Sequence, residues 1–89
     1  MTDDPTVDRL RRELARQDDA ILAAINTRLR LVAELKRYKH ETGLPFVDSG
    51  QERRLLDRLA AENPGPLSED ALRQLFTEIL ALMKRELEP

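Results

Sequence analysis

The sequence predicts an all-α protein with three helices per subunit, the first of them very long, assembled as an intertwined helical homodimer. Apolar residues recur with a helical period along most of the chain, and no strand candidate survives this periodicity. Residues 7–38 contain neither Gly nor Pro. The 89 residues suffice for one domain with a small core, which association with a second copy would enlarge. We expect one helical domain over residues 1–89, with a short tail at 1–5.

The composition excludes several classes of function. Fifteen basic and seventeen acidic residues nearly balance, whereas nucleic-acid or anionic-membrane binding usually needs a basic excess. The absence of Cys excludes disulfides and thiolate metal sites, and the single histidine, His40, argues against structural zinc. No apolar run is long enough for a signal peptide or a membrane span. We therefore expect a cytoplasmic protein without nucleic-acid or membrane partners and without a thiolate metal site or a structural zinc site.

The first helix has clear boundaries in the sequence. Asp4 is a suitable N-cap, and Pro5 suits the first turn because its fixed φ matches a helix. Gly43, followed by Pro45, ends the helix. Its apolar positions lie at helical spacing: Val7, Leu10, Leu14, Ile21, Ile25, Val32 and Leu35.

Two shorter helices follow. Ser49-Gly50-Gln51-Glu52 matches a capping box and predicts that the second helix begins near Ser49. The segment 63–66, Asn-Pro-Gly-Pro, ends that helix. Ser68 can cap the third helix, with Glu69 and Asp70 favourably placed in its first turn. Its apolar face comprises Leu72, Leu75, Phe76, Ile79, Leu80, Leu82, Met83 and Leu87.

The length of the first helix predicts a dimer. About 33 residues at about 1.5 Å each give about 50 Å. A compact chain of this size has a radius of gyration of only about 12 Å. The helix would extend far beyond its own fold with apolar residues along its length, and no Pro or Gly marks a kink. A second chain that packs along this helix is the simpler solution.

Charged residues accompany the apolar stripe of this helix. Arg28 and Lys39 are eleven residues apart and project within about 20° of each other, so they can flank one cavity walled by Val32 and Leu35. Arg11 lies about 25 Å from Arg28 along the axis, so the two arginines of one chain cannot hold one small molecule. In an antiparallel dimer, Arg11 of one chain can approach Arg28 of the other.

Each of these residues also has an ordinary structural interpretation. An Arg or Lys on a long helix is usually solvated or paired one turn away. Glu52 can serve as the capping-box partner of Ser49, and Asp48 as a turn or N-cap residue. None of them is specific when taken singly.

Taken together, these residues strongly resemble the all-helical class of chorismate mutases. The resemblance covers about residues 7–83 and rests on joint spacing. Its motifs are Leu10-Arg11, Asp18, Arg28, Lys39, Gly43 to Asp48, Glu52-Arg53, Asn63 to Leu67, and Leu75 to Ile79. The resemblance implies an interlaced dimer with two active sites, each completed by an arginine of the partner. It also implies a pericyclic rearrangement of chorismate to prephenate, in the biosynthesis of Phe and Tyr, that needs no cofactor.

The resemblance assigns roles residue by residue. Arg11 from the partner and Arg28 would clamp the two carboxylates of chorismate, and Lys39 would donate to a carboxylate and to the ether oxygen. Glu52, with Asp48 nearby, would accept from or orient the ring hydroxyl. The catalytic set is thus Arg11, Arg28, Lys39 and Glu52; Asp48, Gln51, Leu35, Leu80 and Leu87 complete the expected substrate-binding set.

Two positions depart from the family pattern. Gln51 stands where the family usually has Arg, which removes a charge at the rim of the site. Leu87 stands where the family has a Gln or Glu that shares the ether oxygen with the lysine, and Met83 where a small polar residue is common. Glu86 or Glu88 could substitute if the last turn shifts register, and such a Glu must be protonated to donate.

Three alternative functions stay open from the sequence. The same cations would hold the substrates of an isochorismate-pyruvate lyase or of an aminodeoxychorismate mutase. A non-catalytic dimeric module that regulates an aromatic-pathway enzyme is the alternative from a different class. The missing Gln favours that module, whereas the retained Arg11, Arg28, Lys39 and Glu52 oppose it.

Overall fold

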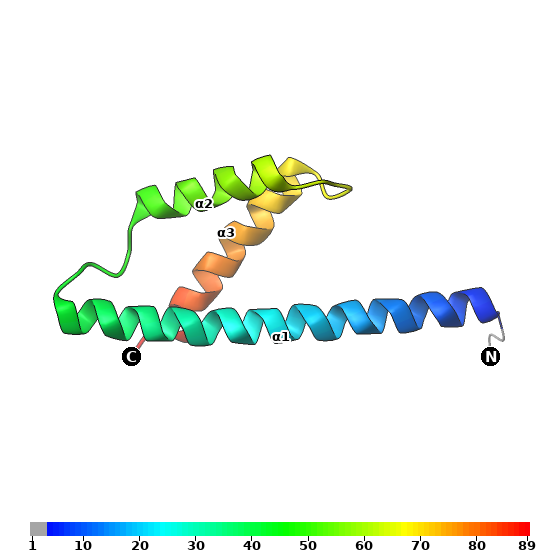
Figure 1. The fold of residues 1–89 in the computed structure, drawn as a ribbon, viewed down its shortest axis with the longest axis horizontal. Helices are drawn as coiled ribbons and strands as arrows, with labels where there is room; N and C mark the ends of the chain where they lie inside the picture. Colours follow the sequence, from blue (N-terminus) through cyan, green and yellow to red (C-terminus); the bar gives the residue numbers. More distant parts are fainter. Residues whose placement is uncertain (1–3) are drawn as a thin grey trace. The chain divides into compact units, whose positions relative to one another are not determined.

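The structure is a computed structural model that describes residues 4–89 and forms three α-helices there (Figure 1): α1 over Pro5–Thr42, α2 over Ser49–Glu62 and α3 over Glu69–Glu86. The chain divides into two compact units, of which the first ends at Val32 and the second spans Ala33–Pro89. The boundary falls inside α1, which has 38 residues. The all-α class and the very long first helix are thus confirmed. Of the expected tail at 1–5, residues 1–3 lie outside the described part of the chain.

The first unit contains the start of α1, which is capped as the sequence predicts. The Asp4 carboxylate accepts hydrogen bonds from the backbone N–H groups of Thr6 at 2.8 Å and Val7 at 3.3 Å. These two donors have no partner inside the helix, and the cap satisfies them. The helix therefore begins where the Asp-Pro pair places it.

The apolar stripe of the first unit is exposed. Leu14 is 62% exposed and Ile21 60%, and Leu10, Leu22 and Leu31 are similarly open. No residue of α1 is buried. Within residues 4–89, the buried apolar side chains are Leu72 and Met83, both on α3. The described chain therefore leaves the apolar side of its longest helix uncovered.

In the second unit, α1 ends in a Schellman motif. The Gly43 N–H donates to the His40 carbonyl at 3.4 Å, and the Leu44 N–H donates to the Lys39 carbonyl at 2.8 Å. Gly43 has a φ of +74°, a left-handed conformation that glycine adopts without steric cost. The prediction that Gly43 ends the helix is confirmed, and the motif fixes the next loop beside the backbone of Lys39.

The start of α2 differs from the predicted capping box. Asp48, not Ser49, is the N-cap, and its carboxylate accepts from the Gln51 N–H at 3.2 Å. Ser49 is then the first helical residue, and Glu52 lies one position too far along to reach back to the cap. Asp48 takes the N-cap position in place of Ser49 because it lies one residue earlier and has the extended backbone of an N-cap residue, at φ −132° and ψ 101°. Glu52 is thereby released for another contact.

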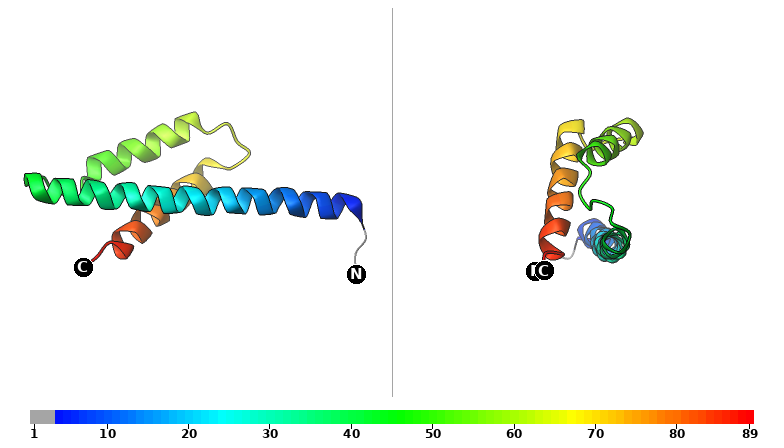
Figure 2. Two further views of the ribbon diagram at one scale, coloured as in Figure 1. Left: turned by 60° about the horizontal axis from the view of Figure 1, so that its bottom comes forward. Right: turned by 90° about the vertical axis from the view of Figure 1, so that its left-hand side faces the viewer.

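Helices α2 and α3 form a hairpin and pack against each other (Figures 1 and 2). Asn63 organises the loop between them, because its side-chain amide donates to the Leu67 carbonyl at 2.8 Å and its oxygen accepts from the Gly65 N–H at 3.0 Å. Ser68 caps α3 as predicted and accepts from the Ala71 N–H at 3.1 Å.

An interhelical ion pair also joins the hairpin. Arg73 of α3 donates to Asp57 of α2 at 3.1 Å and to Glu69 of its own helix at 3.2 Å. The hydrogen bond to Asp57, followed by that to Glu69, raises the pKa of Arg73. These contacts set α2 and α3 side by side in opposite chain directions. None of the helices within residues 4–89 combines the length and hydropathy needed to cross a membrane.

The two serines near the helix starts give a matched test of the capping assignment. Ser68→Ala should lower the free energy of unfolding by about 1 kcal/mol, because it leaves an N-terminal N–H of α3 without its acceptor. Ser49→Ala should change it by less than about 0.5 kcal/mol, because Asp48 carries that cap. Urea unfolding at one protein concentration measures both. A larger loss for Ser49→Ala than for Ser68→Ala would contradict the assignment.

Candidate active site

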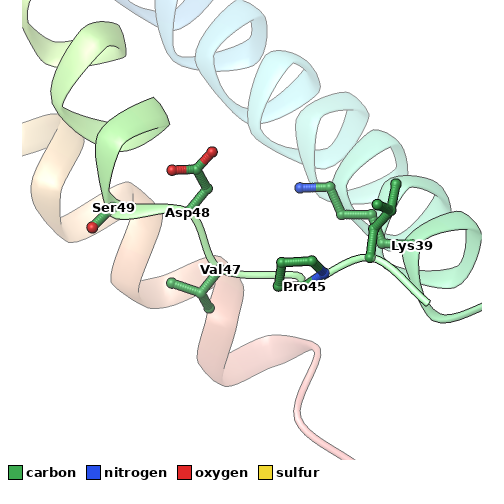
Figure 3. Close-up of a pocket in the computed structure, with 6 residues that line it drawn as sticks. Lys39, Pro45, Val47, Asp48 and Ser49 are labelled. Atoms are coloured by element: carbon green, nitrogen blue, oxygen red, sulfur yellow. The ribbon is translucent and has the colours of Figure 1, made fainter.

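A pocket of about 470 Å³ opens in the second unit where α1 ends and α2 begins (Figure 3). Its lining comes from the C-terminal turn of α1, the connecting loop and the first residues of α2. The residues that line it are Lys39, Leu44, Pro45, Val47, Asp48 and Ser49. Apolar loop residues thus lie between one cation and one carboxylate.

Lys39 and Asp48 face the hollow of this pocket from opposite sides (Figure 3). Lys39 is half-buried, and its ammonium donates to the Phe46 carbonyl at 3.4 Å. Asp48 is held by its role as the N-cap and lies 3.8 Å from Arg54. Both side chains belong to the predicted site, and the fold brings them together through the loop of residues 43–48.

Lys36 anchors the same loop to the end of α3. Its ammonium lies 5.6 Å from the centre of the Phe46 ring, a cation–π distance, and donates to the Leu87 carbonyl. Leu87 is the C-cap of α3, where helix carbonyls lack partners and a cation is favourable. Lys36 therefore connects α1, the pocket loop and the C-terminus of α3.

Glu52 lies one turn of α2 beyond Asp48, on the same side of the helix. Its carboxylate forms an ion pair with the Lys84 ammonium of α3, at 2.5 Å. Both side chains are partly shielded, with exposed fractions of 30% for Glu52 and 38% for Lys84. The predicted capping-box contact of Glu52 is thus replaced by an interhelical ion pair beside the pocket.

The other predicted residues of the second unit lie outside the pocket lining. The Gln51 side chain accepts from Arg54 at 3.0 Å and is exposed. Leu80 and Leu87 are half-buried on the α3 side, and Leu35 is exposed on α1. Glu86 is the last residue of α3 and Glu88 lies two positions further on, and both are exposed.

Arg11 and Arg28 belong to the first unit, on the same continuous stretch of α1. Arg11 is exposed, whereas Arg28 is half-buried. Seventeen residues of unbroken helix separate them, which corresponds to about 25 Å. Two arginines this far apart in one chain cannot contact the same small ligand.

Sequence reasoning missed two lysines of this region, Lys36 and Lys84. Both interrupt apolar stripes: Lys84 lies four residues after Leu80 and three before Leu87, and Lys36 lies four after Val32. A cation at a position where the apolar pattern predicts a buried residue could have marked both lysines as candidates. Their partners are 51 and 32 positions away in the chain, so only the fold identifies them.

The arrangement offers one cation and two acceptors to a small polar ligand. Lys39 supplies a positive charge to an apolar-edged hollow, and Asp48 and Glu52 supply acceptors for a hydroxyl or an amine. Within residues 4–89, His, Asp and Glu side chains nowhere gather in a group of three that would hold a metal ion. Fold and site thus define an all-helical protein with a cation-bearing pocket for a small polar ligand.

The comparisons with known proteins identify the family. A profile described as "Chorismate mutase type II" matches residues 10–88. Two solved structures of chorismate mutase from Thermus thermophilus are similar to this chain. Form I is 40% identical, with a TM-score of 0.85, and covers 88% of this chain and 98% of its own. Form II is 39% identical, with a TM-score of 0.86, and covers 90% and 91%. Among curated proteins, no match to the sequence was found.

The chain belongs to the chorismate mutase type II family, and it is an isomerase with chorismate mutase function. The resemblance inferred from the joint spacing of its motifs is confirmed. The match to catalytic relatives over nearly the whole chain favours the enzyme over a non-catalytic module.

Proposed function

We propose that this chain converts chorismate to prephenate in two pockets of a homodimer, each built from residues of both copies. The reaction is an isomerisation: one ether C–O bond breaks while one C–C bond forms, and no proton is transferred to or from the protein. Catalysis therefore requires confinement of the reactive folded conformer and cations directed at the charge that grows on the ether oxygen.

Lys39 is the residue that carries the proposal. Its half-buried ammonium faces the pocket at the end of α1, and its 3.4 Å contact with the Phe46 carbonyl is long enough to yield to a better acceptor. We assign it to a substrate carboxylate and to the ether oxygen. A cation that is shielded from water stabilises developing negative charge more strongly than a solvated one.

The two arginines are assigned to the carboxylates of the substrate. Chorismate carries two carboxylates, and a guanidinium can bind each one through two parallel N–H donors. Arg28 would act in its own chain, and Arg11 would come from the partner, because the straight helix between them excludes a shared ligand within one chain. This assignment makes each site dependent on the dimer.

The acidic residues are assigned to the ring hydroxyl. Glu52 would accept its hydrogen bond, with Asp48 nearby at the start of the same helix. Leu35, Leu80 and Leu87 would supply apolar walls, and Gln51 would contribute a polar group at the rim. The ring is then held by its carboxylates at one side and by its hydroxyl at the other, which favours the folded conformer.

The dimer itself is supported by the uncovered apolar stripe of α1. Several large apolar side chains of the first unit are about half or more exposed, and none of its residues is buried. A contiguous apolar surface of this kind marks an interaction site. A second copy of the same helix presents a matching stripe, which a two-fold axis brings together.

Substitution of Lys39 tests the catalytic assignment. Wild-type protein should consume chorismate, and acid treatment should convert the product to phenylpyruvate. Lys39→Ala should lower kcat/KM by two to three orders of magnitude or more, a loss of about 3–4 kcal/mol, because a donor to developing charge is removed. Lys39→Arg should be nearly as poor, because the larger guanidinium places its charge elsewhere.

The control is Arg37→Ala, which removes an exposed cation two residues away and should leave kcat/KM within about twofold. Should Lys39→Ala retain more than about a tenth of wild-type kcat/KM while it remains folded, the proposed electrostatic role would be wrong.

Sedimentation of charge-inserted variants tests the dimer. Wild-type protein should sediment as a dimer at micromolar concentration. Leu14→Glu should dissociate or unfold it, because burying an unpaired carboxylate in an apolar interface is costly. Arg12→Glu places the same carboxylate about 160° around the helix and should preserve the dimer. A folded, helical wild-type monomer would contradict the proposal.

A further inference from the structure

The ion pair between Lys84 and Glu52 has features that an incidental surface pair lacks. It joins two helices, and its carboxylate is 30% exposed, less than the acids that pair with Arg16, Arg54, Arg58, Arg73 and Arg85. Most of the other pairs lie within one helix or have acids that are at least half exposed. Shielded ionic contacts are screened less by salt and order their partners more firmly than exposed ones.

The ion pair lies close to the pocket in the structure. Glu52 follows Asp48 by four residues, so their side chains lie on the same side of α2, and Asp48 lines the pocket. Lys84 approaches from α3, on the stripe that also contains Leu80 and Leu87. The pair therefore places a positive charge next to Glu52, one turn of α2 beyond the pocket residue Asp48.

We propose that Lys84 positions the Glu52 carboxylate and makes the site selective for a substrate with a neutral ring hydroxyl over one with a ring ammonium. The inference rests on the proposed function, in which Glu52 accepts the hydrogen bond of that hydroxyl. Lys84 is a positioning residue: it does not touch the reacting bonds and acts only through Glu52.

The selectivity follows from the charge balance at Glu52. A carboxylate without a cationic partner attracts an ammonium more strongly than a hydroxyl, because the hydrogen bond is then charge-assisted on both sides. With the Lys84 ammonium at 2.5 Å, the negative charge of Glu52 already has its counterion. Its remaining lone pairs still accept from a neutral hydroxyl. An ammonium bound there would instead stand close to a second positive charge and be repelled.

The test compares two substrates on one set of variants: chorismate, and its analogue with an amine in place of the ring hydroxyl. Wild-type protein should prefer chorismate. Lys84→Met removes the charge and keeps the apolar stem, so the ratio of the two kcat/KM values should fall about tenfold towards the amine. Lys84→Arg keeps a cation and should restore most of the preference. Arg85→Met, at the neighbouring exposed residue paired with Glu78, is the matched control and should leave the ratio unchanged.

Glu52→Gln tests the direction in which the substrate preference changes. It leaves Lys84 unbalanced, so the ratio should shift in the opposite direction, further towards chorismate. A merely structural role for the ion pair would lower both activities and leave the ratio unmoved. Helicity and sedimentation check that each variant is a folded dimer, and Lys84→Gln replaces the Met variant should that one not fold.

The outcomes separate the inference from the function on which it rests. Wild-type protein that turned over neither compound would overturn the proposed function and this inference together. A second outcome is that the wild type turns over chorismate while Lys84→Met and Lys84→Gln change the ratio of the two kcat/KM values by less than twofold. That result would overturn the inference alone.

Discussion

The apolar stripe of α1 is the feature on which the proposed dimer and its shared sites depend. Burial of apolar surface is the main favourable term in folding, worth about 25 cal/mol per Å². Within residues 4–89 the fully buried apolar side chains are Leu72 and Met83 of α3, and α1 has no fully buried residue. A helix of 38 residues with so little buried surface would gain much of its stability from the partner chain of the proposed dimer. The assembly is therefore expected to be part of folding, and not a later association of finished monomers.

In the proposed dimer, the same helix would divide the catalytic charges between the two copies. Arg11 and Arg28 lie about 25 Å apart on a rigid element, so one ligand cannot span them within a chain. The dianionic substrate needs cations around it, and one chain alone offers Arg28 and Lys39 along the same helix. In the proposed dimer, a second copy would supply the missing charge without any change in the helix. Stability and catalysis would then depend on one interface, and a substitution that loosens it should affect both.

Much of the fold could be predicted because local chemistry decides it. Asp4, Gly43 and Ser68 set helix ends through hydrogen bonds to residues two to five positions away, which a sequence displays directly. The second helix begins at Ser49 as predicted, but its N-cap is Asp48 and not Ser49, because both residues offer oxygens and the preceding loop conformation decides between them. Lys39 and Asp48 were predicted in one site, and nine residues of chain suffice to bring them together.

The contacts of Lys36 and Lys84 could not be predicted in this way. Each depends on how α3 returns towards the end of α1 and the start of α2, so the partners are distant in sequence. Both lysines lie where apolar stripes would otherwise continue. The sequence departs from its family pattern at Leu87, and the structure places the Lys36 ammonium at the backbone of that residue. The region that lacks the expected glutamine is thus not poor in positive charge.

Subunit mixing can show whether each site combines Arg28 of one chain with Arg11 of the other. Arg11→Ala and Arg28→Ala proteins, each nearly inactive, are mixed and refolded. A heterodimer then has one site that lacks both arginines and one that is intact, so each heterodimer should reach half the wild-type activity. Arg28→Ala mixed with Lys39→Ala is the control and should stay inactive, because both residues act within one chain. If heterodimers form in the first mixture but recover no activity, Arg11 does not complete the site of the partner chain.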